Sequence, residues 1–323
     1  MEIPRRPFLH LAGGAAAAFA FSNLAAALDY PKRPVRFVVA FFAGSLSDIL
    51  ARSIAPSLSK HLGQEVIVDD QPGAGGNLAT NIVVRASPDG YTLLEATSAN
   101  VWNAALYDTL NFDFIRDVAP VAGISRTPAV LTVTPSFPAK TVPDFISYAR
   151  ANPGKINMAS GGIGSLPHVA GELFKFMTGI NLVHVPYRGS YLPDLLGGQV
   201  QVAFGPIPTL IEQIRAGKLR ALAVTGPGPS EALPDLPTLG QFVPDYEASA
   251  FNGVGAPKKT PDEIIYRFNA AVDAALQDPE VQKRFAQLGT VPASMTPGEF
   301  AKLIVDESDK WAKVFKAAGI KAD

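Results

Sequence analysis

The chain has 323 residues, of which 47% are hydrophobic and 18% are charged, so it can bury a substantial core in about two domains. It contains no cysteine, which excludes disulfides, thiolate metal sites and cysteine nucleophiles. The formal net charge is -1, and a chain without a basic face is not expected to bind nucleic acid.

Residues 1–28 have the pattern of a cleavable export signal. Arg5 and Arg6 precede an apolar stretch at 8–24, and alanines at 25–27 supply an A-x-A cleavage site. The run from Arg5 to Leu9 resembles the twin-arginine signature R-R-x-F-L, but Pro7 after the arginines leaves general secretory export open as well. A membrane-spanning helix is the alternative, which the A-x-A site disfavours. We therefore predict an exported, periplasmic protein.

Short β-branched runs alternate with helical segments from residue 30 onward, which is typical of parallel strands covered by helices. We expect strands at 35–41, 66–68 and 92–96, and helices at 48–61 and 78–86. A glycine-rich stretch at 73–77 and the pair Asp89-Gly90 supply turns. The pattern predicts a β-α-β-α-β unit.

The alternation begins again after Thr127-Pro128 with a strand at 129–133 and a helix from Pro143 that Thr141 and Asp144 can cap. It continues through segments 156–159, 167–177, 183–185, 192–196, 200–204, 210–216 and 219–224. A proline-rich surface stretch follows at 226–244, and a strand at 249–254 returns the chain to its first half. Three helices finish the protein, the first capped by Thr260 and the last by Thr296.

These elements predict an α/β fold of two Rossmann-like lobes with a central cleft. Residues 29–127 plus 249–323 are expected to form lobe 1, and residues 128–248 lobe 2. Because the chain crosses between the lobes twice, the lobes can hinge about the crossings. The cleft between them is the expected ligand site.

The common catalytic signatures are missing. The chain has no G-x-S-x-G elbow, no G-x-G-x-x-G fingerprint and no P-loop, so we expect neither an enzyme nor a cofactor. His168 and Glu172 have the spacing of two metal ligands on a helix, but H-E-x-x-H is absent and no third ligand is indicated. We therefore predict no metal site, a solvated His61 and a structural His184.

Two loops lie after a strand and before a helix, where free helical N–H groups bind anions. The first loop offers Ala43, Gly44, Ser45 and Asp48. The second offers Ser160, Gly161, Gly164, Ser165 and His168. Two such loops facing one cleft suit a ligand with a carboxylate at one or both ends. Taken singly, each loop fits a plain strand-to-helix turn equally well.

Further polar groups flank these loops. Thr97, Ser98 and Asn100 follow the third strand and either hydrogen-bond a ligand or form an ordinary polar loop. Tyr187 either gives the site a flat wall with a hydroxyl tip or packs as a half-buried aromatic. Asp48 stabilises the helix start, orients the first loop, or does both.

Several segments in this order together resemble the Bug family, the extracytoplasmic solute receptors of tripartite tricarboxylate transporters. The matching stretches include YPKRPV at 30–35, DILAR at 48–52, QPGAGGN at 71–77, SPDGYTLL at 87–94, VHVPYRG at 183–189 and DLLGGQV at 194–200. The likeness covers essentially the whole mature chain.

The resemblance implies a type II periplasmic-binding-protein architecture that closes on small carboxylates. The stretch 43–48 matches the family's first carboxylate loop, 160–168 the second, and 97–100 a flanking contact. The first loop is usually P-G-G-x-x-D, whereas this chain has Ala43 and Ser45 in place of the proline and the second glycine. Many relatives carry an aspartate where this chain has Gly205, so the site is compatible with a less polar, even aromatic, carboxylate.

The predicted protein is a monomeric receptor that binds a small organic acid and delivers it to membrane permease subunits. Two alternatives stay open at the level of sequence. One is an exported enzyme that uses His168 or Asp48 as a general base. The other is a sensory receptor that presents its bound state to a kinase. Dicarboxylates, tricarboxylates, amino acids, aromatic acids and nicotinate-like compounds all fit the loops.

Overall fold

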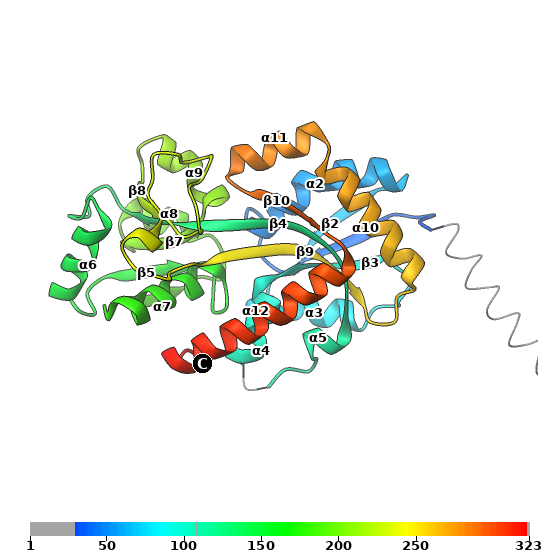
Figure 1. Cartoon of the computed structure of the whole chain (residues 1–323), viewed down its shortest axis with the longest axis horizontal. Coiled ribbons are helices and arrows are strands. Elements are labelled where there is room, and N and C mark those ends of the chain that lie inside the picture. The colour runs from blue at the N-terminus through cyan, green and yellow to red at the C-terminus, as the bar shows by residue number, and fades with distance from the viewer. Residues whose placement is uncertain (1–29, 108, 322–323) are drawn as a thin grey trace, which may run out of the picture.

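The computed structural model describes residues 30–107 and 109–321, so the predicted export signal at 1–28 lies outside the described residues. In this part of the chain a curled sheet has the strand order β2-β1-β3-β9-β4-β7-β5-β6, and β8 and β10 pair with β4. Helices cover the two halves of the sheet separately (Figure 1). The arrangement is the predicted α/β fold.

Lobe 1 is built on three parallel strands, β1 Val35–Val39, β2 Val66–Asp70 and β3 Thr92–Thr97. The helices that follow these strands are α2 Leu46–Leu62, α3 Asn77–Val84 and α4 Ser98–Leu106. A short helical turn, η1 Ala74–Gly76, precedes α3. The predicted β-α-β-α-β unit is confirmed, and α4 is an addition to it.

Lobe 2 is also built on parallel strands, because β5 pairs in parallel with β6 and with β7. Its strands are β5 Asn157–Ser160, β6 Val183–Pro186, β7 Val202–Pro206 and β8 Arg220–Val224. Its helices are α6 Val142–Ala151, α7 Leu166–Thr178, α8 Leu192–Gly197 and α9 Ile207–Arg215. The Thr141 hydroxyl accepts the Asp144 N–H at the start of α6, which confirms the predicted cap. The proline-rich stretch contains the short turn η2 Leu239–Gln241 and isolated bridges at Ser230, Leu233 and Thr238.

Two long antiparallel strands connect the lobes (Figure 1). They are β4 Val118–Val133 and β9 Ser249–Pro257. β4 pairs with β9 and β10 along its first part and with β7 and β8 along its last part, so a single strand enters both lobes. The predicted strand at 129–133 is therefore only the end of a sixteen-residue strand. The proposed lobe boundaries at 127/128 and 248/249 stay a prediction.

The C-terminal segment returns to lobe 1. It comprises α10 Asp262–Leu276, α11 Pro279–Leu288, β10 Val291–Met295 and α12 Pro297–Ala318, and a short helix α5 Phe114–Asp117 precedes β4. Thr296 caps α12 with Glu299 as predicted. The predicted cap at Thr260 is wrong, because α10 begins after Pro261 and the Thr260 hydroxyl is buried without a hydrogen bond to any described residue.

Aromatic side chains fill the cores of both lobes. Trp102 of α4 packs against Trp311 of α12 with ring centroids 5.2 Å apart, which fixes the last helix on lobe 1. In lobe 2, Phe174 of α7 lies 5.3 Å from Phe204 of β7. Burying each such ring stabilises the fold by about 2–3 kcal/mol. The helices are thereby held with their N-termini at fixed positions.

Candidate functional site

A cavity of about 130 Å³ lies between the lobes, and the first residues of five helices line it. Helices α2 and α4 approach from lobe 1, and α7, α8 and α9 from lobe 2. The lining residues at these helix starts are Ser45, Leu46, Ser47, Thr97, Ser98, Ala99, Ser165, Leu166, Pro167, Tyr191, Leu192, Pro206, Thr209 and Leu210. Further lining residues are Phe41, Phe42, Gly44, Trp102, Gly161, Ser190, Ala250 and Asn252.

None of the described residues that line the cavity carries a charge. The walls are mainly apolar, and the polar groups are hydroxyls, the Asn252 amide, the Trp102 indole N–H and the backbone. The first N–H groups of a helix have no carbonyl partner within it, and the helix dipole adds partial positive charge there. Several helix starts on one apolar cavity therefore suit an anion that needs hydrogen-bond donors rather than a counter-ion.

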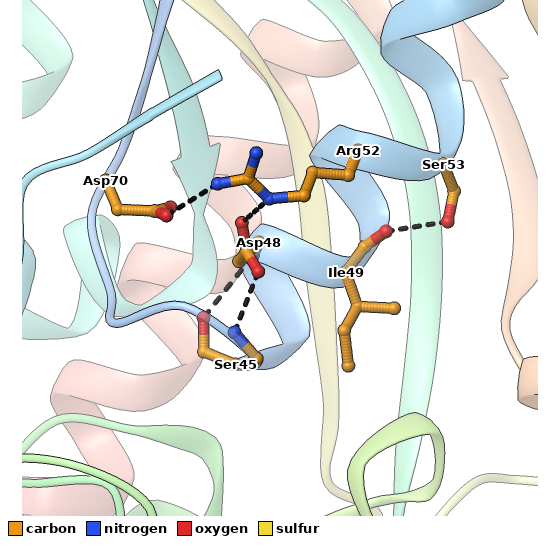
Figure 2. A network of polar contacts seen from close by, with 7 residues as sticks. Ser45, Asp48, Ile49, Arg52, Ser53 and Asp70 are labelled. Atoms are coloured by element: carbon orange, nitrogen blue, oxygen red, sulfur yellow. Dashed lines mark hydrogen bonds and ion pairs between the residues drawn. The ribbon is translucent and has the colours of Figure 1, made fainter.

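Asp48 holds the first loop in place (Figure 2). Its carboxylate accepts the Gly44 N–H at 2.7 Å and pairs with Arg52, which in turn pairs with Asp70 at 2.8 Å. The Ser45 hydroxyl accepts the Asp48 N–H at 3.3 Å, so serine at this position caps α2. Gly44 and Ser45 line the cavity, whereas Ala43 and Asp48 do not. Asp48 thus stabilises the helix start and orients the loop together.

Two histidines hold the second loop. The His168 Nδ1 accepts the Gly164 N–H at 3.2 Å, and the His184 Nε2 lies 2.6 Å from the Ser160 Oγ. Their rings stack with centroids 4.2 Å apart. Burial lowers the pKa of His168 to about 3 and that of His184 to about 4, with Lys175 adding to both, so both are neutral at pH 7.

Of the five predicted residues in this second loop, Gly161 and Ser165 line the cavity. Ser160, Gly164 and His168 lie behind the lining and shape the loop. The loop's form therefore depends on side chains that need not touch a ligand.

The lobes touch at glycines of their loops. A Cβ added to Gly164 would lie 2.5 Å from the Asn103 Oδ1 of α4, and one added to Gly75 would lie 2.8 Å from the carbonyl oxygen of Ile163. Asn103 also donates to the Gly75 carbonyl at 2.8 Å. The two predicted loops also meet at one cavity, because Gly44 and Ser45 of the first loop and Gly161 and Ser165 of the second line it.

The other predicted site residues divide into two groups. Thr97 and Ser98 line the cavity, while Asn100 accepts the Thr97 N–H at 2.6 Å and lies behind it. Tyr187 donates to Asp194 at 2.6 Å and does not line the cavity. Gly205 also lies outside the lining, and Tyr191 and Leu210 occupy the space that a side chain there would need.

Sequence reasoning missed the polar floor of the cavity. Asn252 of β9 lines it, and its Nδ2 donates to the Oε1 of Glu95, a residue only 1% exposed. Burial raises the pKa of Glu95 to about 8, against hydrogen bonds from Asn252 and Ser47 that lower it. An acid inside the apolar strand at 92–96 was the available signal, since such a residue needs a partner or a function.

The geometry defines a two-lobe solute-binding protein. The family described as tripartite tricarboxylate transporter family receptor matches residues 50–320. The chain belongs to this family, which confirms the resemblance to the Bug receptors noted in the sequence. Among the described residues no helix is long and apolar enough to cross a bilayer, and no three His, Asp or Glu side chains gather as a metal site.

Relatives and solved structures agree with this assignment. BugT of Bordetella pertussis is 35% identical over 297 residues, which are 90% of this chain and 91% of BugT. The structure of Rpa4515 of R. palustris with adipate is 38% identical with a TM-score of 0.87, covering 91% of this chain and 99% of that one. The structure of MatC from Rhodopseudomonas palustris with bound malate is 31% identical with a TM-score of 0.83, covering 88% and 99%.

Proposed function

We propose that this protein captures a small organic carboxylate between its lobes in the periplasm and delivers it to the permease subunits of a tripartite transporter. The observation that carries the proposal is the convergence of helix N-termini from both lobes on an uncharged, mainly apolar cavity. Such a cavity offers a carboxylate several donors, and its walls suit the carbon chain.

The ligands of two relatives support this chemistry. Rpa4515 holds adipate and MatC holds malate, which are both dicarboxylates. In the present chain, the starts of α2 and α4 would hold one end of the ligand, and the start of α7 the other. Capture then takes place by closure, because a ligand that bridges both lobes favours the closed arrangement by its differential affinity for it.

The contacts of the candidate bases support a receptor over an enzyme. The His168 Nδ1 is occupied by the Gly164 N–H, and the Asp48 carboxylate by Gly44 and Arg52. Neither side chain lines the cavity, so neither reaches a bound substrate in this arrangement. A sensory receptor would use the same closure, and we favour transport because of the family to which the chain belongs.

A thermal-shift screen of the protein lacking residues 1–28 tests the proposal. Organic acids of two to eight carbons, adipate and malate among them, would be compared with the corresponding neutral amides. A ligand at a hundredfold excess over its Kd adds about 2.7 kcal/mol and raises the melting temperature by about 5 °C. The amides should give no shift. If no acid raises the melting temperature, the proposed function is wrong.

A further inference from the structure

A cluster of buried polar side chains forms the floor of the cavity. Thr97 of β3 and Ser125 of β4 lie opposite Asn252 of β9, and Glu95 lies two residues before Thr97, so all four side chains face one side of the sheet. Ser47 at the start of α2 interacts with the Glu95 carboxyl. Each of these five side chains is at most 4% exposed.

Two atoms of this floor have no hydrogen-bond partner among the described residues, the Asn252 Oδ1 and the Ser125 Oγ. Leaving one buried polar atom unpaired costs about 1–3 kcal/mol. Of these two residues Asn252 lines the cavity and Ser125 does not, so the Asn252 amide is the group with which a bound ligand can pair.

The contact with Glu95 decides which end of the Asn252 amide is available. The Nδ2 donates to the Glu95 Oε1, so the Oδ1 is directed elsewhere as an acceptor. The helix starts around the cavity supply donors, which a carboxylate uses. An ionised carboxylate has no proton to donate, so it cannot use the Asn252 Oδ1. The acceptor fits a second, proton-bearing group on the ligand.

We infer that Glu95 positions Asn252 as the acceptor for a hydroxyl group, so that the site prefers a hydroxylated organic acid over the same acid without the hydroxyl. The inference rests on the proposed function and names the substrate class of the same cavity. A hydroxyl fits better than an ammonium group, because the described lining has no charged acceptor and the partial positive charge of the helix starts disfavours a cation.

Isothermal titration with matched acids tests the preference. The probes are malate against succinate, and 2-hydroxyadipate against adipate, at pH 7. In the wild-type protein each hydroxylated acid should bind about tenfold more tightly than its partner. Asn252→Ala should reduce this ratio to about one while the deoxy acids still bind.

Variants of Glu95 test its positioning role. Glu95→Leu removes the acceptor for Nδ2 and lets the amide turn, so the ratio should fall, whereas Glu95→Gln keeps an acceptor oxygen and should keep the ratio. Glu95→Met serves if the leucine variant does not fold. The double variant Glu95→Leu/Asn252→Ala should lose no more of the ratio than Asn252→Ala alone, because both changes act on one contact.

A matched control is Thr132→Val on β4. It removes an equally buried hydrogen bond, from Thr132 to the Ala203 carbonyl, away from the cavity lining. It should lower stability and leave the ratio unchanged. Equal binding of hydroxylated and deoxy acids by the wild-type protein, or a ratio that survives Asn252→Ala, overturns this inference alone. Failure of every acid to bind overturns the proposed function instead.

Discussion

The contact between the lobes at Gly164 makes a specific prediction about ligand affinity. Gly164 has a φ of +79°, and its Cα faces the Asn103 Oδ1 so closely that a Cβ would lie 2.5 Å from it. Asn103 cannot move freely, since its Nδ2 donates to the Gly75 carbonyl and to the Asn77 Oδ1, each at 2.8 Å. Gly164→Ala should therefore oppose the approach of the lobes.

The expected cost has two parts. An alanine at positive φ destabilises the backbone by about 1 kcal/mol, whether the lobes are together or apart. Displacing Asn103 disrupts two hydrogen bonds at about 1 kcal/mol each, and this part applies only when the lobes touch. Under the proposed capture by closure, the second part should appear as a loss of affinity of about 2 kcal/mol, or about thirtyfold.

The matched control is Gly179→Ala at the end of α7. Gly179 has a φ of +69°, and a Cβ there would have no atom within 4 Å, so this variant carries the backbone strain without the contact. Gly164→Ala should lose at least as much stability as Gly179→Ala in urea unfolding, but only Gly164→Ala should lose affinity in calorimetric titration with adipate or malate. If the two variants bind equally well, the loops do not close on the ligand at Gly164.

Three further predictions concern single side chains. Gly205→Asp places a Cβ 2.4 Å from both the Tyr191 hydroxyl and Leu210, so it should destabilise the protein by about 1–3 kcal/mol in thermal unfolding. Adding Tyr191→Phe removes one of these contacts and should recover part of the lost stability. No recovery would contradict the steric explanation. Burial lowers the pKa of His168 to about 3, below the unfolded value near 6.5, so the stability that its neutral form contributes is lost as the pH falls below 6.5. His168→Asn should therefore lose less stability than the wild-type protein between pH 6.5 and 4 in urea titrations. Parallel pH profiles of the two proteins would refute this. Glu95 should make stability depend on pH in the opposite direction, because its pKa is raised to about 8 and the stability that its neutral form contributes is lost as the pH rises from 4.5 to 8. The stability of Glu95→Gln relative to the wild-type protein should therefore grow by about 1 kcal/mol per pH unit in this range. A constant difference would show that Glu95 titrates normally.

Local patterns predicted the elements whose signals lie within a few residues. The lobe 1 unit follows from apolar runs separated by glycine-rich turns, and the caps at Thr141 and Thr296 follow from their S/T-x-x-D/E spacing. β4 was found only in part, because Pro120, Gly123 and Arg126 interrupt its apolar pattern. Its full length is stabilised by pairing with β9 and β10, which are distant in sequence.

In the candidate site, too, features with a local sequence signal were predictable and features that depend on distant contacts were not. The loops at 43–48 and 160–168 were predictable, because a loop between a strand and a helix N-terminus lies at the edge of the sheet where α/β proteins bind ligands. The walls were not, since Leu46, Leu166 and Leu192 at helix starts look like core residues in a sequence. Asn252 was missed because its role depends on the register of β9 against β3, which brings it beside Glu95.

The ionisable side chains of this site lie behind its lining, and physical reasons favour that arrangement. Asp48 and Arg52 neutralise one another while they hold the first loop, and Glu95 is placed to fix an amide. A charged group on the cavity wall would lose hydration on closure and would attract any ion of opposite sign, whereas fixed dipoles lose little solvation and demand a defined geometry. With Tyr191 occupying the space of a side chain at Gly205, no acid can stand there unless that ring moves. Selectivity then depends on the positions of the hydrogen-bond donors and of the Asn252 amide. The helix starts and the register of β9 set these positions, and the net charge of the protein does not.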